Sequence, residues 1–274
     1  MALDVDGTTI DLDQRLHPRT RAAVRAAGDS GTWIVLASGR MYRSALHWGI
    51  ELAIRAPLVL YQGALVRGMP GPGAPVVDGV PQGELVMEDG VEPAAALRSL
   101  EVARAHGWHR QAYRDDRVVC EEDREEARIY GRIAQVAYDV VPDLAPLMAA
   151  GSTKVVCVVA DPAEAQRCED TLREALGASA RVVRSLPEFV EITSPTAGKG
   201  RALRVVCDRL GVALEDTVAV GDAPNDVDLL EAAGFAVAIR SSGASVLAAA
   251  DAVCAPPGEA GVADVLESLG LVPA

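Results

Sequence analysis

The sequence predicts an α/β fold built on a parallel sheet, with a second α/β module inserted into it. Short apolar runs at 32–37 and 58–61 alternate with helical stretches, which is the order of a parallel sheet. A turn-rich segment at 68–83 then interrupts the alternation, and residues 84–192 form a strand–helix series of their own. From residue 198 the first alternation resumes, so the inserted module separates two halves of one domain.

The first domain is expected to begin with a very short strand. Only three residues precede Asp4, and the sequence leaves open whether the native chain begins upstream of Met1. Residues 18–28 have proline near the start and glycine at the end of an alanine-rich run, as a helix does. The continuous apolar run at 32–37 favours a buried strand, and a further helix is expected to extend to about residue 53.

The remaining elements follow from the same patterns. In the inserted module, helices are expected at about 92–106, 121–137 and 162–176, and strands at 117–120, 154–159, 180–184 and 189–193. In the closing segment, helices are expected at 198–210 and 226–233 and around the last strand, and strands at 217–220, 235–239 and 252–254. The expected domains are 1–80 plus 194–274, and the inserted 84–192.

Composition excludes several classes of function. The net charge of −13 argues against nonspecific binding to nucleic acid or to an anionic membrane surface. The sequence has no apolar run near the length of a transmembrane helix, and it opens on an acidic motif rather than a signal peptide. The five cysteines are dispersed without metal-binding spacing, which indicates a reduced, cytoplasmic protein whose thiols are mostly buried.

Two aspartates stand two residues apart at the start of the chain, in the run Asp-Val-Asp-Gly-Thr. In an extended segment Asp4 and Asp6 point to the same side, and Gly7 permits a tight turn after them. The pattern suits a Mg²⁺ site with a nucleophilic carboxylate, although Asp and Gly are also common in plain turns. A calcium-binding EF-hand loop is excluded, because its sixth and twelfth positions are Thr9 and Arg15.

Three further polar clusters follow predicted strands or open a predicted helix. A serine and backbone amides at a helix start can grip a phosphate oxygen, a lysine supplies compact positive charge, and more carboxylates can complete a Mg²⁺ site. Each cluster alone also fits helix capping, a turn or solvated surface. Their order, each near the carboxyl edge of a parallel sheet, favours one shared site. The residues are Ser38, Gly39 and Arg40, then Lys199, and then Asp222, Asn225 and Asp226.

Lysine is rare in this chain: of 26 basic residues only Lys154 and Lys199 are lysines. Both are therefore candidates for positions that need a compact ammonium group. Lys199 also invites comparison with a nucleotide-binding P-loop. That comparison fails, because Thr193 stands where the loop needs its first glycine and Gly200 stands where it needs serine or threonine.

With these motifs the sequence resembles the haloacid dehalogenase superfamily, and within it the Cof-type phosphatases with a large α/β cap (type IIB). The matching stretches are 4–8, 37–40, 191–200 and 221–230, with 233–239 and 259–263 similar to the family's closing region. The likeness covers about 1–80 and 194–274, and the segment between them matches only in size and in its general order of strands and helices. The resemblance implies a Rossmann-like doubly wound parallel sheet as the core and an inserted α/β cap that selects the substrate.

The resemblance also implies a role for each matched residue. Asp4 would attack the phosphoryl group and form an aspartyl-phosphate, and Asp6 would protonate the leaving oxygen and then activate water. Asp4, the backbone carbonyl of Asp6, and Asp222 would bind Mg²⁺. The residues expected to hold the phosphoryl oxygens are Ser38, Gly39, Lys199 and Asn225, and those expected to support the site are Arg40 and Asp226.

Four residues depart from the family pattern. Thr9 stands where leucine is usual, and serines 241–242 stand where Asn-Ala is common. Gln62 replaces the asparagine that usually precedes Gly-Ala, which leaves open whether a hydrogen bond at the edge of the site is kept.

The expected function is Mg²⁺-dependent hydrolysis of small phosphorylated metabolites, with sugar phosphates as candidates, by a cytoplasmic monomer or weak homodimer. The alternatives are a phosphohexomutase, a phosphatase dedicated to one sugar phosphate such as mannosyl-phosphoglycerate, and a non-catalytic phosphosugar-binding regulator. No nucleic acid or membrane partner is expected. The cap is expected to close about hinges at 68–83 and 193–198. Its arginines Arg110, Arg114 and Arg117 are expected at the surface.

Overall fold

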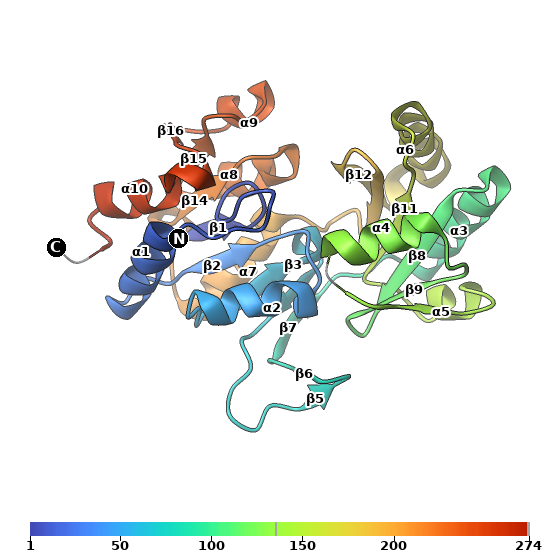
Figure 1. Cartoon of the computed structure of the whole chain (residues 1–274), viewed down its shortest axis with the longest axis horizontal. Coiled ribbons are helices and arrows are strands. Elements are labelled where there is room, and N and C mark those ends of the chain that lie inside the picture. The colour runs from blue at the N-terminus through green and yellow to red at the C-terminus, as the bar shows by residue number, and fades with distance from the viewer. Residues whose placement is uncertain (135, 273–274) are drawn as a thin grey trace. The chain divides into compact units, whose positions relative to one another are not determined.

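A computed structural model of the chain describes residues 1–134 and 136–272 (Figure 1). Its contacts divide the chain into two compact units. The core unit comprises Met1–Met87 and Gly198–Ala274, and the inserted unit comprises Glu88–Ala197. Both boundaries of the inserted unit lie a few residues after those expected from the sequence.

The core unit is built on an eight-stranded sheet with the order β16-β15-β14-β1-β2-β3-β4-β7. Its strands are β1 (Ala2–Asp4), β2 (Val35–Ala37), β3 (Leu58–Leu60), β4 (Leu65–Arg67), β7 (Leu85–Glu88), β14 (Val218–Gly221), β15 (Phe235–Ile239) and β16 (Ala252–Cys254). All pairs from β16 to β3 are parallel, and β4 runs antiparallel to β3. The predicted parallel α/β sheet is confirmed.

Strand β1 lies in the middle of this sheet although it has only three residues. It pairs in parallel with β14 on one side and with β2 on the other. Ala2, Leu3 and Asp4 are all buried. Because hydrogen bonds to two neighbours fix the strand, three residues are enough to position its carboxyl end.

Helices and buried side chains cover both faces of the core sheet. One apolar cluster joins Ala2 and Ala219 of the strands to Leu203 of α7 and Leu229 of α8. Alternate strand residues such as Leu3 face the other way and are equally buried, as expected of a doubly wound sheet. The helices are α1 (Pro18–Asp29), α2 (Tyr42–Glu51), α7 (Lys199–Leu210), α8 (Val227–Ala232), α9 (Ala244–Ala248) and α10 (Gly261–Ser268).

The turn-rich segment contains a small hairpin. Strands β5 (Val76–Val77) and β6 (Val80–Pro81) pair antiparallel. The two residues between them, Asp78 and Gly79, have φ of 47° and 77°. Positive φ at both central positions is the geometry of a two-residue hairpin turn with an Asp-Gly sequence.

The inserted unit has a six-stranded sheet with the order β10-β9-β8-β11-β13-β12. Its strands are β8 (His109–Arg114), β9 (Arg117–Cys120), β10 (Tyr138–Val140), β11 (Lys154–Val158), β12 (Arg181–Leu186) and β13 (Phe189–Thr193), and its helices are α3 (Pro93–His106), α4 (Glu125–Ala134), α5 (Ala145–Ala149) and α6 (Pro162–Leu176). Strand β8 is central but is not predicted from the sequence, because the polar residues of His-Arg-Gln-Ala-Tyr-Arg hide its buried character.

The two faces of this second sheet differ in polarity. On one face, Ala112 and Val155 join the apolar cluster of α3 and α6. The opposite face carries Lys154, whose Nζ donates to Glu191 Oε1 (3.1 Å) and lies 4.9 Å from the ring centroid of Tyr113. Lys154 and Glu191 are only 1% and 3% exposed. Burial alone would lower the pKa of Lys154, but the charge and hydrogen bond of Glu191, together with Tyr130, outweigh it and raise the pKa, so Lys154 stays protonated.

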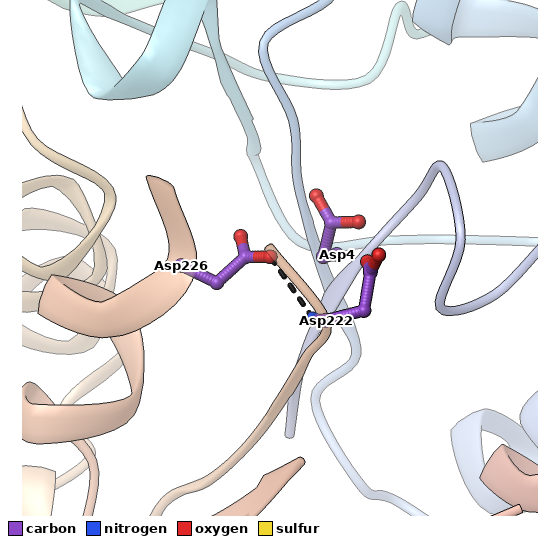
Figure 2. A group of neighbouring side chains, drawn as sticks. All are labelled: Asp4, Asp222 and Asp226. Carbon is purple, nitrogen blue, oxygen red and sulfur yellow. Dashed lines mark hydrogen bonds between the residues drawn. The ribbon is translucent and has the colours of Figure 1, made fainter. Parts of the chain in front are cut away.

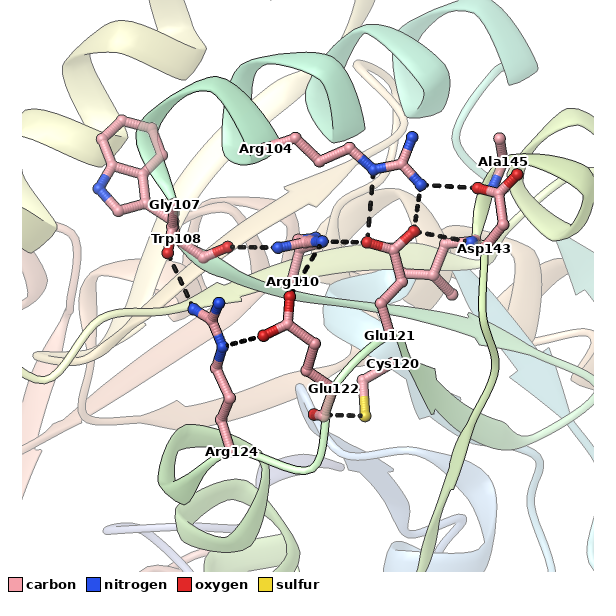
Figure 3. Close-up of polar contacts among 11 residues, drawn as sticks. Arg104, Gly107, Trp108, Arg110, Cys120, Glu121, Glu122, Arg124, Asp143 and Ala145 are labelled. Carbon is pink, nitrogen blue, oxygen red and sulfur yellow. Dashed lines mark hydrogen bonds and ion pairs between the residues drawn. The ribbon is translucent and has the colours of Figure 1, made fainter.

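Arginines in the inserted unit differ in their surroundings (Figure 3). Arg110 forms an ion pair with Glu121, which also pairs with Arg104. Burial would raise the pKa of Glu121, but its hydrogen bonds from these arginines and the backbone lower it to about 2. The expectation that Arg110 lies at the surface is wrong, because β8 places it 9% exposed beside this carboxylate. Arg117 is exposed as predicted, and Arg114 is half-buried.

Replacing Lys154 with methionine is expected to lower the free energy of unfolding by about 3–5 kcal/mol, because Glu191 would remain buried without its counter-charge. The double variant Lys154→Met/Glu191→Leu should recover most of that loss. Urea unfolding at pH 7 measures both. The control is Arg117→Met, which breaks an ion pair with about half of each side chain exposed and should change stability by less than about 1 kcal/mol. A loss below about 1 kcal/mol for Lys154→Met would contradict the prediction.

No helix in residues 1–134 and 136–272 combines the length and the apolar character needed to cross a bilayer. The five cysteines are free thiols, and all except Cys254 are buried, as predicted.

Candidate active site

The ends of three neighbouring parallel strands bring the predicted motifs to one edge of the core sheet. Asp4, the last residue of β1, lies opposite Ala37, the last residue of β2. On the other side Leu3 lies opposite Val220 of β14, so the loop after β14 begins level with the loop after β1. Parallel strands end at the same edge, and the loops after β1, β2 and β14 therefore meet there.

Three carboxylates, which Figure 2 shows, and the ammonium group of Lys199 form the centre of the site. Carboxylate oxygens of Asp4, Asp222 and Asp226 all lie within 4.8 Å of one another. Lys199 Nζ donates to Asp4 Oδ1 (2.6 Å) and to Asp226 Oδ1 (2.5 Å). Lys199, Asp4 and Asp226 are at most 5% exposed. The lysine balances only one of the three charges that the carboxylates carry when ionised.

Burial dominates the protonation of this cluster. It raises the pKa of Asp4 well above its ordinary range, and the charge of Asp226 raises it further, against the opposing effect of Lys199. Burial also raises the pKa of Asp222 to about 6, although the hydroxyl of Thr8 donates to this carboxylate (2.8 Å). Burial alone would lower the pKa of Lys199, but the charges of Asp226 and Asp4 outweigh it and raise the pKa.

The donors of this cluster fit a hard divalent cation. Ionised carboxylates are the protein ligands that Mg²⁺ prefers, and a bound cation would stabilise the charged forms that burial disfavours. Asp4 and Asp222 supply such oxygens at the cluster. Asp226 is already engaged, because Oδ1 accepts from Lys199 and Oδ2 accepts from two backbone N–H groups of the loop after β14. Asp226 therefore suits a supporting position.

The loop after β1 is held against the cluster by small residues and hydroxyl groups. Gly7 has a φ of 87°, and a Cβ at this position would overlap the carboxylate of Asp222. The Thr9 hydroxyl donates to the backbone oxygen of Asp4 (2.6 Å). The sequence predicts no role for Thr8 or Thr9, yet the Thr8 hydroxyl donates to the carboxylate of Asp222 and the Thr9 hydroxyl to the backbone oxygen of Asp4. The sequence feature that could have indicated these roles is the position of both threonines directly after the aspartate motif.

Asp6 lies apart from the carboxylate cluster. Strand β1 ends at Asp4, and the chain then turns, with the backbone oxygen of Val5 accepting from both Thr9 N and Ile10 N. Only Asp4 of the pair belongs to the strand, and Asp6 lies two residues beyond its end, where its backbone bridges to Ile10. The turn allows the two carboxylates to meet different partners.

The guanidinium group of Arg40 binds both carboxylate oxygens of Asp6. Its Nε donates to Asp6 Oδ2 (2.7 Å) and its Nη2 to Asp6 Oδ1 (2.5 Å), the bidentate geometry that favours Arg–carboxylate pairs. The backbone N of Arg40 also donates to Ser38 Oγ (3.1 Å), which ties the loop after β2 together. The Asp6 side chain remains 41% exposed, whereas that of Arg40 is 10% exposed.

The remaining predicted residue, Asn225, is directed toward Gln62. Asn225 Nδ2 donates to Gln62 Oε1 (2.9 Å). The replacement of the usual asparagine by Gln62 therefore keeps a hydrogen bond at the edge of the site. The amide of Gln62 also lies against Gly39, where a Cβ would overlap it.

The sequence matches a known protein family over most of its length. The family model of haloacid dehalogenase-like hydrolases matches residues 1–266. The chain belongs to this family. Among curated relatives, an HMP-PP phosphatase of Cronobacter sakazakii is 27% identical over 238 residues, which cover 85% of this chain and 80% of the relative. A phosphoglycolate phosphatase of Methanothermobacter thermautotrophicus is 24% identical over 266 residues, which cover 97% and 96%.

Solved structures of the family have the same fold. A protein from Thermotoga maritima aligns with a TM-score of 0.83 and 29% identity over 97% of this chain and 96% of its own. A sugar phosphatase of subclass IIB aligns with a TM-score of 0.83 and 19% identity over 99% and 98%. The predicted resemblance to the capped, Cof-type members of the superfamily is confirmed.

Proposed function

We propose that this hydrolase is a Mg²⁺-dependent phosphatase that cleaves small phosphorylated metabolites through an aspartyl-phosphate at Asp4. The observation that carries the proposal is the cluster in which Asp4 and Asp226 accept from the buried Lys199 and Asp222 adjoins them, with the accessible carboxylate of Asp6 on the loop after β1. A carboxylate nucleophile needs local positive charge when its substrate is also an anion. Lys199 supplies part of this charge, and Mg²⁺ bound through Asp4, Asp222 and the backbone carbonyl of Asp6 would neutralise the rest.

Each residue then has one task in the proposed reaction. An oxygen of Asp4 attacks phosphorus while the bond to the ester oxygen breaks, and Asp6 gives that oxygen a proton. Asp6 next takes a proton from water, whose oxygen attacks phosphorus and releases Asp4 and inorganic phosphate. Throughout both steps the phosphoryl oxygens are held by Ser38, Gly39, Lys199 and Asn225.

The relatives support small metabolites as the substrate class. One is an HMP-PP phosphatase and another a phosphoglycolate phosphatase, so two small phosphorylated compounds are substrates within the family. We extend this class to the present chain and include sugar phosphates in it. We assign the choice among them to the inserted unit, and we expect a cytoplasmic monomer or weak homodimer without a nucleic acid or membrane partner.

Removal of the metal is expected to stop the reaction. In a panel of phosphorylated metabolites, phosphate release should require Mg²⁺ and should fall at least about 100-fold in EDTA, because the metal contributes several kcal/mol of charge stabilisation. Added Mg²⁺ in excess over EDTA should restore the rate. Full activity in EDTA would contradict the metal requirement. Absence of release from every compound by the folded protein would instead favour a mutase, which needs a bisphosphate activator, or a binding regulator.

A further inference from the structure

The turn after β3 has an unusual backbone. Tyr61, Gln62 and Gly63 have φ of 51°, 58° and 87°, so three successive residues adopt the left-handed conformation. Glycine adopts it freely, but a residue with a Cβ is strained there. Such strain persists only where surrounding contacts hold it, and it is concentrated at functional sites. Tyr61 and Gln62 are also 1% and 6% exposed, so neither side chain is a surface feature of the turn.

This turn contacts all three loops that carry the proposed phosphate-binding residues. Its backbone is bound to the loop after β2, since Tyr61 N donates to Arg40 O (3.0 Å) and Gln62 N donates to Ser38 O (3.2 Å). Gly63 is packed so closely on the start of α7 that a Cβ would overlap the backbone of Gly198. The next residue after Gly198 is Lys199, so this contact sets the position of the helix start that bears the lysine.

The side chain of Gln62 completes the connection. Its Oε1 accepts from Asn225 Nδ2 (2.9 Å) in the loop after β14, and its Nε2 lies against Gly39 in the loop after β2. A turn that needed only a left-handed backbone would be served better by glycine or asparagine. The longer side chain of glutamine therefore indicates that the amide has to span the distance between the loop after β2 and the loop after β14.

We propose that Gln62 is a positioning residue, whose amide sets the separation between Gly39 and Asn225 in the phosphate-binding site. This inference rests on the proposed phosphatase function. Gln62 takes no part in proton or phosphoryl transfer. It acts through the two residues on either side of it, because displacement of phosphate-binding groups by about 1 Å is enough to lower a rate about 100-fold.

The test separates positioning from folding. Gln62→Gly keeps the left-handed backbone, and should leave the melting temperature unchanged or raised, within about 3 °C. The same variant should lower kcat/KM for p-nitrophenyl phosphate or the best metabolite by about 10–100-fold and weaken inhibition by orthovanadate. Gln62→Asn keeps an amide that is one methylene shorter and should recover only part of the activity.

The chain offers a matched control in Gln14, which has the same side chain and a φ of 60° but lies in the loop beyond the aspartate motif. Gln14→Gly should change the melting temperature similarly and leave kcat/KM within about twofold. In a double-mutant cycle, Asn225→Ala should add little to Gln62→Gly, because the pair acts as one unit.

Failure of the positioning role and failure of the proposed phosphatase function give different results. If wild type is active, and Gln62→Gly has equal activity and equal affinity for orthovanadate, the positioning role is overturned. If wild type releases no phosphate, the phosphatase proposal fails, and calorimetric binding of inorganic phosphate in Mg²⁺ then tests Gln62. Weaker binding by Gln62→Gly than by wild type and Gln14→Gly would support positioning, and equal binding would overturn it.

Discussion

Asp4→Asn is expected to lower kcat for phosphate release by about 10⁴-fold, because an amide cannot form the acyl-phosphate that the proposed mechanism requires. The variant should nevertheless fold. Asp4 lies beside two other carboxylates, the buried Asp226 and the half-buried Asp222, and Lys199 keeps Asp226 as its partner after the substitution. Melting temperature without metal should therefore stay close to that of wild type, while stabilisation by Mg²⁺ should be reduced because a neutral amide oxygen replaces one of its charged carboxylate ligands.

The matched control is Asp13→Asn, which makes the same chemical change in the same loop region. Asp13 is exposed and forms an ion pair with the exposed Arg15, so its loss should affect neither activity nor Mg²⁺ stabilisation. Trapping of radioactive phosphate on wild-type protein, and none on Asp4→Asn, would identify the acceptor directly. If Asp4→Asn retained activity within tenfold of wild type, attack by Asp4 would be excluded and direct attack by water would replace it.

The position of the site was predictable because it depends on features that short sequence patterns express. Apolar runs that end in polar residues predict the carboxyl edge of a parallel sheet, and Asp4, Ser38 and Asp222 each follow such a run. The register of β1 between β2 and β14 then brings the three residues together. These patterns can be recognised from neighbouring residues in the sequence, without knowledge of contacts between distant ones.

The features that escaped prediction depend on tertiary contacts. Burial of Arg110 requires the carboxylate of Glu121, which directly follows the next strand, and no local pattern indicates that pairing. The end of β1 at Asp4, two residues before Asp6, goes with a turn in which Thr9 N and Ile10 N both donate to Val5 O. The reach of Gln62 to Asn225 joins residues that are 163 positions apart in the chain. Sequence indicated only that Gln62 was unusual.

The electrostatic balance of the site explains why Lys199 is fully buried. Without a metal, this single ammonium group is the charge that hydrogen-bonds Asp4 and Asp226, and Asp222 adjoins them. Each of the two raised carboxylate pKa values means that the folded state holds protons that the unfolded chain releases. The contribution of these groups to stability is therefore fully present below about pH 4 and is lost as pH rises through the folded pKa, which is about 6 for Asp222.

Lys199→Met should consequently lower both activity and stability. We expect kcat to fall by about 10²–10³-fold through loss of charge stabilisation at the phosphoryl group. The free energy of unfolding without metal should fall by about 3–5 kcal/mol at pH 8, because three carboxylates remain together without a counter-charge. At pH 5 the deficit relative to wild type should be smaller, since protonation of Asp4 and Asp222 removes part of the repulsion. Urea unfolding of both proteins at the two pH values measures this difference.

Mg²⁺ and a second substitution test the cause of the instability. Mg²⁺ should stabilise Lys199→Met more than wild type, because the variant's cluster has one more uncompensated negative charge. Adding Asp226→Asn should recover part of the stability by removing one carboxylate, but should recover no activity. A deficit that is equal at pH 5 and pH 8 and insensitive to Mg²⁺ would show that lost packing of the lysine side chain, rather than charge, destabilises the variant. The site would then not depend on Lys199 for its electrostatic balance.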